Sequence, residues 1–432
     1  MALRLNSLDE DFPEKFNALA TASRGALDEV GPAVADIIKD VCANGFAAIA
    51  DYTQRFDRVS IDPQTARIEK GEITAAANRI APDLRDALQL AADRIFAFHE
   101  RQLPKDIMYK DEVGASLGWR WTSVDAAGLY APGGRAAYPS SVLMNAIPAK
   151  VAGVRRLVMC TPTPGGEITD AVLAAAHIAD IDEIWRIGGA QAVAAMAHGA
   201  DPIEPVDVIV GPGNAYVAEA KRQVFGVVGV DSIAGPSEIL VVADSDNPVS
   251  WIAADLLSQA EHDPSSQCIL ITDDAAYADA VVNEVGAQIA AHPRREIVHA
   301  AWRNNSAVIV VNDLLADAPR LVDRLAPEHL ELAVAEPDAL FARIRHAGAV
   351  FLGRYAPEAL GDYVAGPNHV LPTSGAARFA SGLSVQNFMK RTTILQTDLA
   401  AFSALGPAAA RLADAEGLPG HAGSIRRRLE DN

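Results

Sequence analysis

Between about residues 130 and 240, short apolar runs alternate with segments in which apolar residues recur at helical spacing. The predicted strands are RLVMC (156–160), EIWRIGG (183–189), DVIVGPG (207–213) and EILVVAD (238–244). The predicted helices between them are SVLMNAIPAKVAGV, DAVLAAAHIADI, AQAVAAMAHGA and NAYVAEAKRQVFG. Continuous apolar strands separated by helices of about 10–15 residues are typical of a parallel sheet covered on both faces. This part of the chain is therefore predicted to be one α/β domain.

The same alternation resumes after residue 260, where helical patterns separate the apolar runs CILIT, SAVIVV, HLELAV and AVFLG. Residues 26–110 have helical spacing in VADIIKDVCANGFAAIADYTQRF and in LRDALQLAADRIFAFHERQL. Gly45 predicts a break inside the first of these segments. A strand-like pair, ASLGWRWTSV and AAGLYAPGG, follows them.

These patterns predict an α/β fold of two Rossmann-like parallel-sheet domains, one inserted in the other, with small N-terminal and C-terminal helical segments. Residues 1–25 are predicted to be an N-terminal arm. Residues 26–129 plus 241–382 are predicted to form the first α/β domain, and residues 130–240 the second. Residues 383–432 are predicted to be a helical tail.

Composition and charge narrow the function. The chain has 432 residues, of which 50% are hydrophobic and 22% charged, as is ordinary for a globular enzyme. Its formal net charge of −19 argues against nucleic acid or an anionic membrane as a partner. No run approaches the roughly 18 apolar residues of a membrane span. Cys42, Cys160 and Cys268 are far apart and form no disulfide framework. We therefore expect a cytoplasmic protein.

The stretch DLLSQAEHDPSSQCILIT joins a predicted helix to a predicted strand. The helix is expected to begin at Asn247-Pro248, since Asn is a good N-cap, and to end before Pro264. Gln259 and His262 are three residues apart, so both side chains leave one face of its last turn. An amide oxygen and an imidazole placed in this way can supply half of the ligands of a metal site. From this spacing alone, a polar helix end with a solvated His is the simpler interpretation.

Three Gly-rich turns follow predicted strands, and they are Tyr130-Ala-Pro-Gly-Gly, Gly188-Gly189-Ala-Gln191 and Gly211-Pro-Gly-Asn214. Ligands of parallel α/β sheets lie beyond the carboxyl ends of the strands, where helix N-termini favour phosphates. The turns therefore fit a nucleotide pocket. The GxGxxG pattern is absent, so tight turns that merely need glycine are an equally good explanation.

Acidic residues and imidazoles occur together at three other places, which are Glu328-His329, Asp362 with His369, and Glu416 with His421. Glu328-His329 precedes an apolar strand, where a carboxylate and a near-neutral base can transfer protons. An exposed turn is the alternative there. One combination of distant residues is Gln259, His262, Asp362 and His421. Two imidazoles and two oxygen donors suit zinc or another borderline divalent ion. The residues alone thus predict an α/β enzyme and leave its metal and nucleotide open.

Longer stretches of sequence are more specific. In order, they are YAPGGRAAYPSSVLMNAIPAKVAGV, IGGAQAVAA, VGPGNAYVAEAK, GPSEIL, LLSQAEHD, APEHLEL, GDYVAGPNHVLPT, LSVQNFMKRTT and EGLPGHAGS. From about residue 30 to its end, the chain closely resembles the histidinol dehydrogenase family. The resemblance implies a zinc- and NAD-dependent four-electron oxidation of L-histidinol to L-histidine through an enzyme-held aldehyde, the last steps of histidine biosynthesis.

The resemblance also implies roles for individual residues. The implied ligands of one zinc ion per subunit are Gln259, His262, Asp362 and His421. The implied NAD contacts are Tyr130, Gln191 and Asn214. The implied substrate contacts are Ser237, Gln259, His262, His329, Asp362, His369, Glu416 and His421. The enzyme would be a homodimer with a shared active site, in which the C-terminal His comes from the partner subunit.

Glu328 and His329 are the predicted catalytic pair. His329 would take the hydroxyl proton of the alcohol, and Glu328 would activate water to attack the aldehyde. A related zinc- and NAD-dependent dehydrogenase of another small polar alcohol, such as a sulfonated diol, is the alternative. A non-catalytic binding protein is a third hypothesis, but it has no need of this pair. Glu416 together with His421 favours histidinol.

Overall fold

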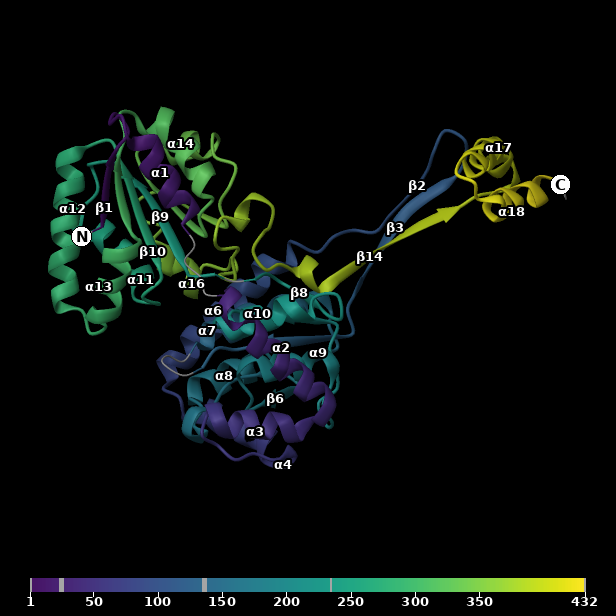
Figure 1. Cartoon of the computed structure of the whole chain (residues 1–432), viewed down its shortest axis with the longest axis horizontal. Helices are drawn as coiled ribbons and strands as arrows, with labels where there is room; N and C mark the ends of the chain where they lie inside the picture. The colour runs from purple at the N-terminus through teal and green to yellow at the C-terminus, as the bar shows by residue number, and fades with distance from the viewer. Residues whose placement is uncertain (1, 23–26, 134–137, 234, 431–432) are drawn as a thin grey trace. The chain divides into compact units, whose positions relative to one another are not determined.

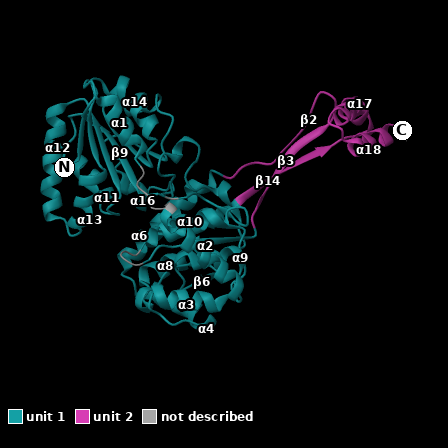
Figure 2. Ribbon diagram, in the orientation of Figure 1, with its two compact units in different colours: residues 1–102, 125–388 teal, residues 103–124, 389–432 magenta. Residues whose placement is uncertain are grey.

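The computed structural model describes residues 2–22, 27–133, 138–233 and 235–430. It divides into two compact units, residues 1–102 with 125–388 and residues 103–124 with 389–432 (Figure 2). The first unit contains two parallel sheets, so the predicted α/β class with two parallel-sheet domains is confirmed. Among the described residues, no helix is long and apolar enough to cross a membrane.

The larger sheet of the first unit has six parallel strands in the order β1-β11-β10-β9-β12-β13. Figure 1 labels β1, β9 and β10 of this sheet. Its strands are β1 Leu3–Asn6, β9 Glu238–Ala243, β10 Gln267–Thr272, β11 Ala307–Val310, β12 His329–Ala333 and β13 Ala349–Leu352. Side chains alternate between its faces, because successive residues of a strand point in opposite directions. Ile239 and Val241 lie in one hydrophobic cluster, and Leu240 and Val242 lie in another.

Helices cover both faces of this sheet. The cluster with Ile239 is completed by α11 Val249–Ala260, α12 Ala275–Ala291 and α13 Arg295–Asn305. The cluster with Leu240 is completed by α1 Phe12–Thr21, α14 Leu314–Leu325 and α15 Pro337–Phe341. Strands β9 to β12 are buried along their whole length, as the continuous apolar runs predicted.

The second sheet of this unit has five parallel strands in the order β6-β5-β4-β7-β8. They are β4 Ala126–Tyr130, β5 Arg156–Cys160, β6 Glu183–Trp185, β7 Val208–Val210 and β8 Gly229–Val230. Its connecting helices are α7 Pro139–Ala152, α8 Asp170–Ile178, α9 Gly189–His198 and α10 Ala215–Val224. The predicted strands at 156–160, 183–189 and 207–213 all belong to it.

A second layer of helices packs on α7 to α10, and it differs from the predicted domain division. Its members are α2 Leu27–Asn44, α3 Phe46–Phe56, α4 Pro63–Ala66, α5 Lys70–Arg79 and α6 Pro82–Glu100. Helix α2 contacts α9 and α10, α5 contacts α8, and α6 contacts α7. We predicted residues 26–129 to join residues 241–382, but these helices cover the five-stranded sheet instead. An amphipathic pattern shows that a helix has a buried face without showing which sheet buries it.

Two other parts of the predicted domain division differ from the structure. The predicted arm, residues 1–25, supplies β1 to the six-stranded sheet and buries Phe12 and Phe16 of α1 against it. The strand at 238–244, assigned to the inserted domain, lies at the centre of the six-stranded sheet as β9. The predicted boundary between residues 25 and 26 lies outside the described residues. The break at Gly45 is confirmed, with a φ of 57° between α2 and α3.

The second unit combines an antiparallel sheet with two helices. Its sheet has the order β14-β3-β2, and its strands are β2 Ile107–Lys110, β3 Ser116–Ser123 and β14 Met389–Gln396. Its helices are α17 Leu399–Ala415 and α18 Pro419–Glu430. Residues 383–432 were predicted to be helical throughout, so β14 is a correction. Thr392, Thr393 and Ile394 are β-branched residues, which favour strands. The prediction did not take this preference into account.

Candidate active site

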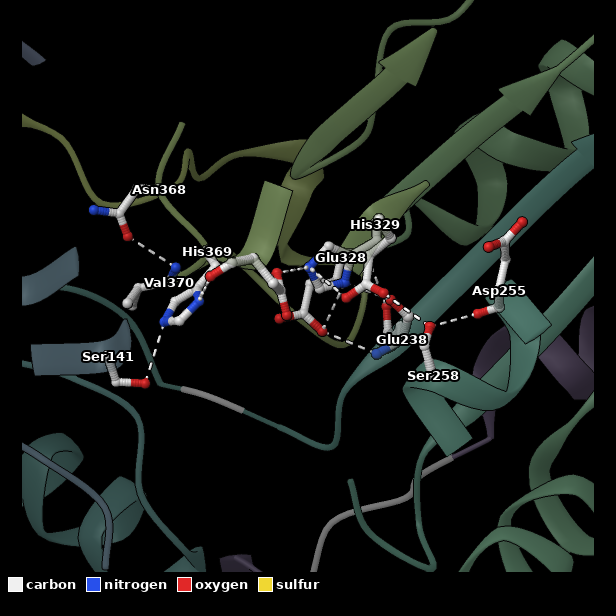
Figure 3. A network of polar contacts seen from close by, with 11 residues as sticks. Ser141, Glu238, Asp255, Ser258, Glu328, His329, Asn368, His369 and Val370 are labelled. Atoms are coloured by element: carbon white, nitrogen blue, oxygen red, sulfur yellow. Dashed lines mark hydrogen bonds and ion pairs between the residues drawn. The ribbon is translucent and has the colours of Figure 1, made fainter. Parts of the chain in front are cut away.

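The Glu328-His329 pair lies at the amino end of the six-stranded sheet. His329 is the first residue of β12 and pairs with Ile239 of the neighbouring strand β9. Glu238 is the first residue of β9 and directly follows Ser237. Figure 3 shows Glu238 close to Glu328 and His329. Both Glu328 and His329 are buried, which excludes the exposed turn considered as their alternative.

Glu238 makes hydrogen bonds with both Glu328 and His329. The backbone N–H of Glu238 donates to Glu328 Oε2 at 2.9 Å, and the N–H of Glu328 donates to Glu238 Oε2 at 3.3 Å. His329 Nδ1 lies 2.9 Å from the backbone oxygen of Glu238. A carbonyl oxygen only accepts, so Nδ1 carries a proton, and in the neutral ring Nε2 is left as a base. The sequence analysis missed Glu238, although an acidic residue opening the apolar run EILVVA was a usable signal.

Helix α16 (Glu358–Tyr363) brings two carboxylates to the other side of the imidazole. His329 Nε2 lies 3.6 Å from Asp362 Oδ1 and 3.8 Å from Glu358 Oε1. The two acids are four residues apart, so they share one face of the helix. Glu358 is buried and accepts a hydrogen bond from Ser258 Oγ at 3.0 Å. The sequence analysis also missed Glu358, although its helical spacing to Asp362 was a usable signal.

In this cluster, burial and the charges of neighbouring groups shift the pKa of His329 in opposite directions. Burial raises the pKa of Glu328 to about 8 and that of Glu358 to about 7. Burial alone would lower the pKa of His329, but the nearby carboxylates outweigh it and raise that pKa to about 10. Several acids around one imidazole leave an excess of buried negative charge, which a divalent cation would neutralise. Asp362, Glu358 and His329 each offer a ligand atom within 4.8 Å of the others.

Gln259 lies in the last turn of α11, next to this cluster, and His262 follows the end of that helix. Gln259 is fully buried, yet neither polar atom of its amide has a hydrogen-bond partner among the described residues. Unsatisfied buried amides are costly, so this one is suited to a ligand. Burial lowers the pKa of His262, and the charge of Asp362 opposes that shift. His262 therefore lies within electrostatic reach of Asp362.

The start of α11 differs from the prediction. Asn247 was expected to cap the helix, but its side chain donates to the backbone oxygens of Asp244 at 2.9 Å and Ala333 at 2.7 Å. It thereby joins the ends of β9 and β12. The helix ends at Ala260, with Glu261 as its C-cap, before Pro264 as predicted.

His369 connects the cluster to helix α7 of the domain with the five-stranded sheet. Its Nδ1 lies 3.0 Å from the backbone oxygen of Asp362, and its Nε2 lies 3.2 Å from Ser141 Oγ of α7 (Figure 3). Glu416 and His421, by contrast, belong to the second unit. Glu416 caps α17, His421 lies in α18, and both side chains are exposed in the single chain. Six of the predicted site residues around His329 thus come from the first unit, and they are Ser237, Gln259, His262, Glu328, Asp362 and His369.

The three Gly-rich turns meet at the carboxyl edge of the five-stranded sheet. Tyr130 ends β4, and its hydroxyl accepts the N–H of Gly189 at 3.1 Å. A Cβ on Gly211 would lie 2.2 Å from the backbone oxygen of Tyr130, so this turn needs glycine for close approach. Asn214 caps α10 by accepting from its first turn. The buried Oε1 of Gln191 has no partner among the described residues.

Known proteins match almost the whole chain. A family model described as histidinol dehydrogenase matches residues 21–429. A histidinol dehydrogenase of Rhodospirillum rubrum is 60% identical over 429 residues, covering 99% of each chain. One from Rhizobium meliloti is 57% identical over 429 residues, with 99% of each chain covered. The chain belongs to the histidinol dehydrogenase family.

The fold agrees with this assignment. The crystal structure of histidinol dehydrogenase from Elizabethkingia anophelis matches with a TM-score of 0.94 and 34% sequence identity, covering 100% of this chain and 98% of that one. Membership of the histidinol dehydrogenase family makes the chain an NAD-dependent oxidoreductase of histidine biosynthesis. A paralogue for another polar alcohol is not favoured by these matches.

One buried ion pair supports the third Gly-rich turn. Lys221 of α10 pairs with Asp231, and both side chains are almost fully buried. Lys221 Nζ also donates to the backbone oxygen of Gly211 at 3.0 Å, and Asp231 Oδ2 accepts the N–H of Gly211 at 2.8 Å. The Lys221–Asp231 pair therefore makes hydrogen bonds to both backbone groups of Gly211, the residue that packs on Tyr130.

Lys221→Met is expected to lower the free energy of unfolding by about 3–5 kcal/mol, because it leaves the Asp231 carboxylate buried without its cation. Urea denaturation measures this change. The control is Arg155→Met, which breaks the exposed pair between Arg155 and Asp125 and should cost less than about 1 kcal/mol. Equal losses in the two variants would show that the buried pair does not stabilise the turn.

Proposed function

We propose that this chain oxidises L-histidinol to L-histidine through enzyme-bound L-histidinal, using zinc and NAD. The observation that supports this most is the geometry of His329, whose Nδ1 donates to Glu238 while its Nε2 faces Asp362 and Glu358. We further propose that the six-stranded domain carries the metal and the catalytic residues, and that the five-stranded domain binds NAD. Two oxidations of one substrate need a base for the alcohol and a base for water, and Glu328-His329 supplies both.

The donor set fits one zinc ion per subunit. The proposed ligands are Gln259, His262, Asp362 and the partner's His421, and the first of these has an otherwise unsatisfied buried amide. The geometric group of His329, Glu358 and Asp362 shares only Asp362 with this set. His329 is not among the proposed ligands, because a metal bound to its Nε2 would remove the lone pair that accepts the proton. Bound zinc would hold the imidazole and amine of histidinol, both of which are good zinc ligands.

The chain's own residues account for the proton transfers. In the first oxidation, His329 Nε2 accepts the hydroxyl proton of the alcohol. This role needs the neutral ring, and therefore a cation that offsets the carboxylates that raise the pKa of His329. Glu328 then takes a proton from water as the water attacks the aldehyde. His329, having passed its first proton to solvent, deprotonates the resulting hydrate for the second oxidation. Ser237 and His369 lie beside these groups and would contact the substrate. NAD, held by Tyr130, Gln191 and Asn214, would supply the hydride acceptor for both oxidations.

The cofactor and the partner subunit complete the proposed site. Tyr130, Gln191 and Asn214 would contact NAD, since they stand on the turns that meet at the carboxyl edge of the five-stranded sheet. Glu416 and His421 would act in the partner's site of a homodimer. Their exposure in the single chain supports this proposal, because a group that serves another subunit must be accessible.

The protein is expected to form two NADH for each L-histidinol consumed, because the alcohol and the aldehyde are oxidised in turn. NADH absorbance against residual histidinol measures the ratio. A chelator should abolish NADH formation, and added zinc should restore it. One NADH per histidinol would limit the activity to the first oxidation. No NADH from folded, zinc-loaded protein would refute the proposal.

A further inference from the structure

The five-stranded sheet has the strand order of a dinucleotide-binding fold. Numbered along the chain from β4, the order β6-β5-β4-β7-β8 is 3-2-1-4-5. Dinucleotides bind such sheets at the carboxyl edge beside the first strand, and an acidic residue following the second strand binds the adenosine ribose. The second strand here is β5, and the segment directly after it, residues 161–166 (TPTPGG), contains no acid; the first acid beyond it is the exposed Glu167. No acid therefore stands at the end of the strand itself.

Asp57 brings a carboxylate to this position from outside the sheet. It is the C-cap of α3, in the second layer of helices. Its Oδ2 accepts the backbone N–H of Thr163 at 3.3 Å, and its backbone oxygen accepts the N–H of Gly165 at 2.9 Å. Two separate contacts thus fasten Asp57 to the loop that follows β5. Among the described residues, Asp57 Oδ1 makes no hydrogen bond, and the side chain is half-buried.

The same loop touches the proposed NAD turns. A Cβ on Gly188 would lie 2.4 Å from Pro162 Cβ, and a Cβ on Gly133 would lie 2.7 Å from the Pro162 backbone oxygen. Burial raises the pKa of the Tyr130 phenol, and the charge of Asp57 adds to that effect. Asp57 is therefore within electrostatic reach of Tyr130. The hydroxyl of Thr163 is buried and has no partner among the described residues.

We propose that Asp57 binds the adenosine ribose hydroxyls of NAD and thereby selects NAD over NADP. This inference rests on the proposed function. A carboxylate accepts from both the 2′- and the 3′-hydroxyl, and it repels the 2′-phosphate of NADP. Arg55 and Arg58 flank Asp57 in the sequence, and both are exposed. Without the Asp57 carboxylate, this short segment keeps its two cations, which can attract a 2′-phosphate.

The test is direct binding of NADH and NADPH to the zinc-loaded protein, measured by isothermal titration calorimetry without histidinol. Asp57→Ala should weaken NADH binding by roughly tenfold or more, as for loss of hydrogen bonds to a charged group. Asp57→Asn keeps an oxygen that can accept from Thr163 but loses the charge. It should therefore strengthen NADPH binding by about tenfold relative to NADH. The control is Asp51→Asn, an equal charge change at an exposed position of α3.

The outcomes separate this inference from the proposed function. Wild-type protein that binds NADH in preference to NADPH, with the preference reduced in Asp57→Asn and unchanged in Asp51→Asn, supports the role of Asp57. An unchanged preference in Asp57→Asn overturns that role and leaves the proposed function intact. Wild-type protein that binds neither nucleotide and makes no NADH from histidinol overturns both.

Discussion

His262→Ala is expected to lose bound zinc and the oxidation of histidinol together. His262 follows the end of α11, beside the buried Gln259 amide and within electrostatic reach of Asp362. Losing even an outer partner of a metal site costs roughly 10–100-fold in affinity, so removal of a direct ligand should cost more. Zinc content by atomic absorption and NADH formation at saturating histidinol are the two measurements. An active, zinc-free variant would refute the ligand assignment.

His299→Ala is the matched control for this experiment. His299 lies on α13, its side chain is exposed, and it has no place in the proposed site. Zinc content and turnover should stay at the wild-type level. A loss of zinc in both variants would point to a general effect of removing imidazoles. That result would leave His262 without a special role.

Glu328→Gln is expected to slow aldehyde oxidation by about 10²–10⁴-fold, the usual contribution of a general base, and alcohol oxidation much less. The amide keeps an oxygen that can accept from the Glu238 N–H, so the loop should keep its shape. Glutamine cannot take a proton from water at neutral pH. Supplying histidinol and histidinal separately resolves the two half-reactions. Equal losses in both would rule out Glu328 as the base for water.

Glu331→Gln provides the comparison for that variant. Glu331 is buried two residues further along β12 and has no role in the proposed reaction. Burial raises the pKa of its carboxyl, as it raises that of Glu328, so the two variants make the same change to a buried acid. Both half-reactions should continue. A selective loss of aldehyde oxidation here would move the assignment away from Glu328.

The sequence alone determined most strands of the two parallel sheets, though not β1 or β8, and most of the residues of the proposed site. Apolar runs of strand length identified β5, β6, β7, β9 and β10, because a strand covered on both faces must be apolar along its length. Glycine at positive φ explains why the break at 45 was predictable. Long family-specific motifs carried the proposed roles of Gln259, His262 and Asp362, which spacing alone could not assign.

Only the tertiary structure decided how distant segments share a surface. Helices α2 to α6 cover the five-stranded sheet, a choice that no local pattern encodes. Glu238 and Glu358 join the site because β9 lies beside β12 and α16 lies next to His329. Asp57 reaches the loop after β5 for the same reason. Periodicity records which face of an element is buried, whereas the identity of its neighbour depends on contacts between residues far apart in the chain.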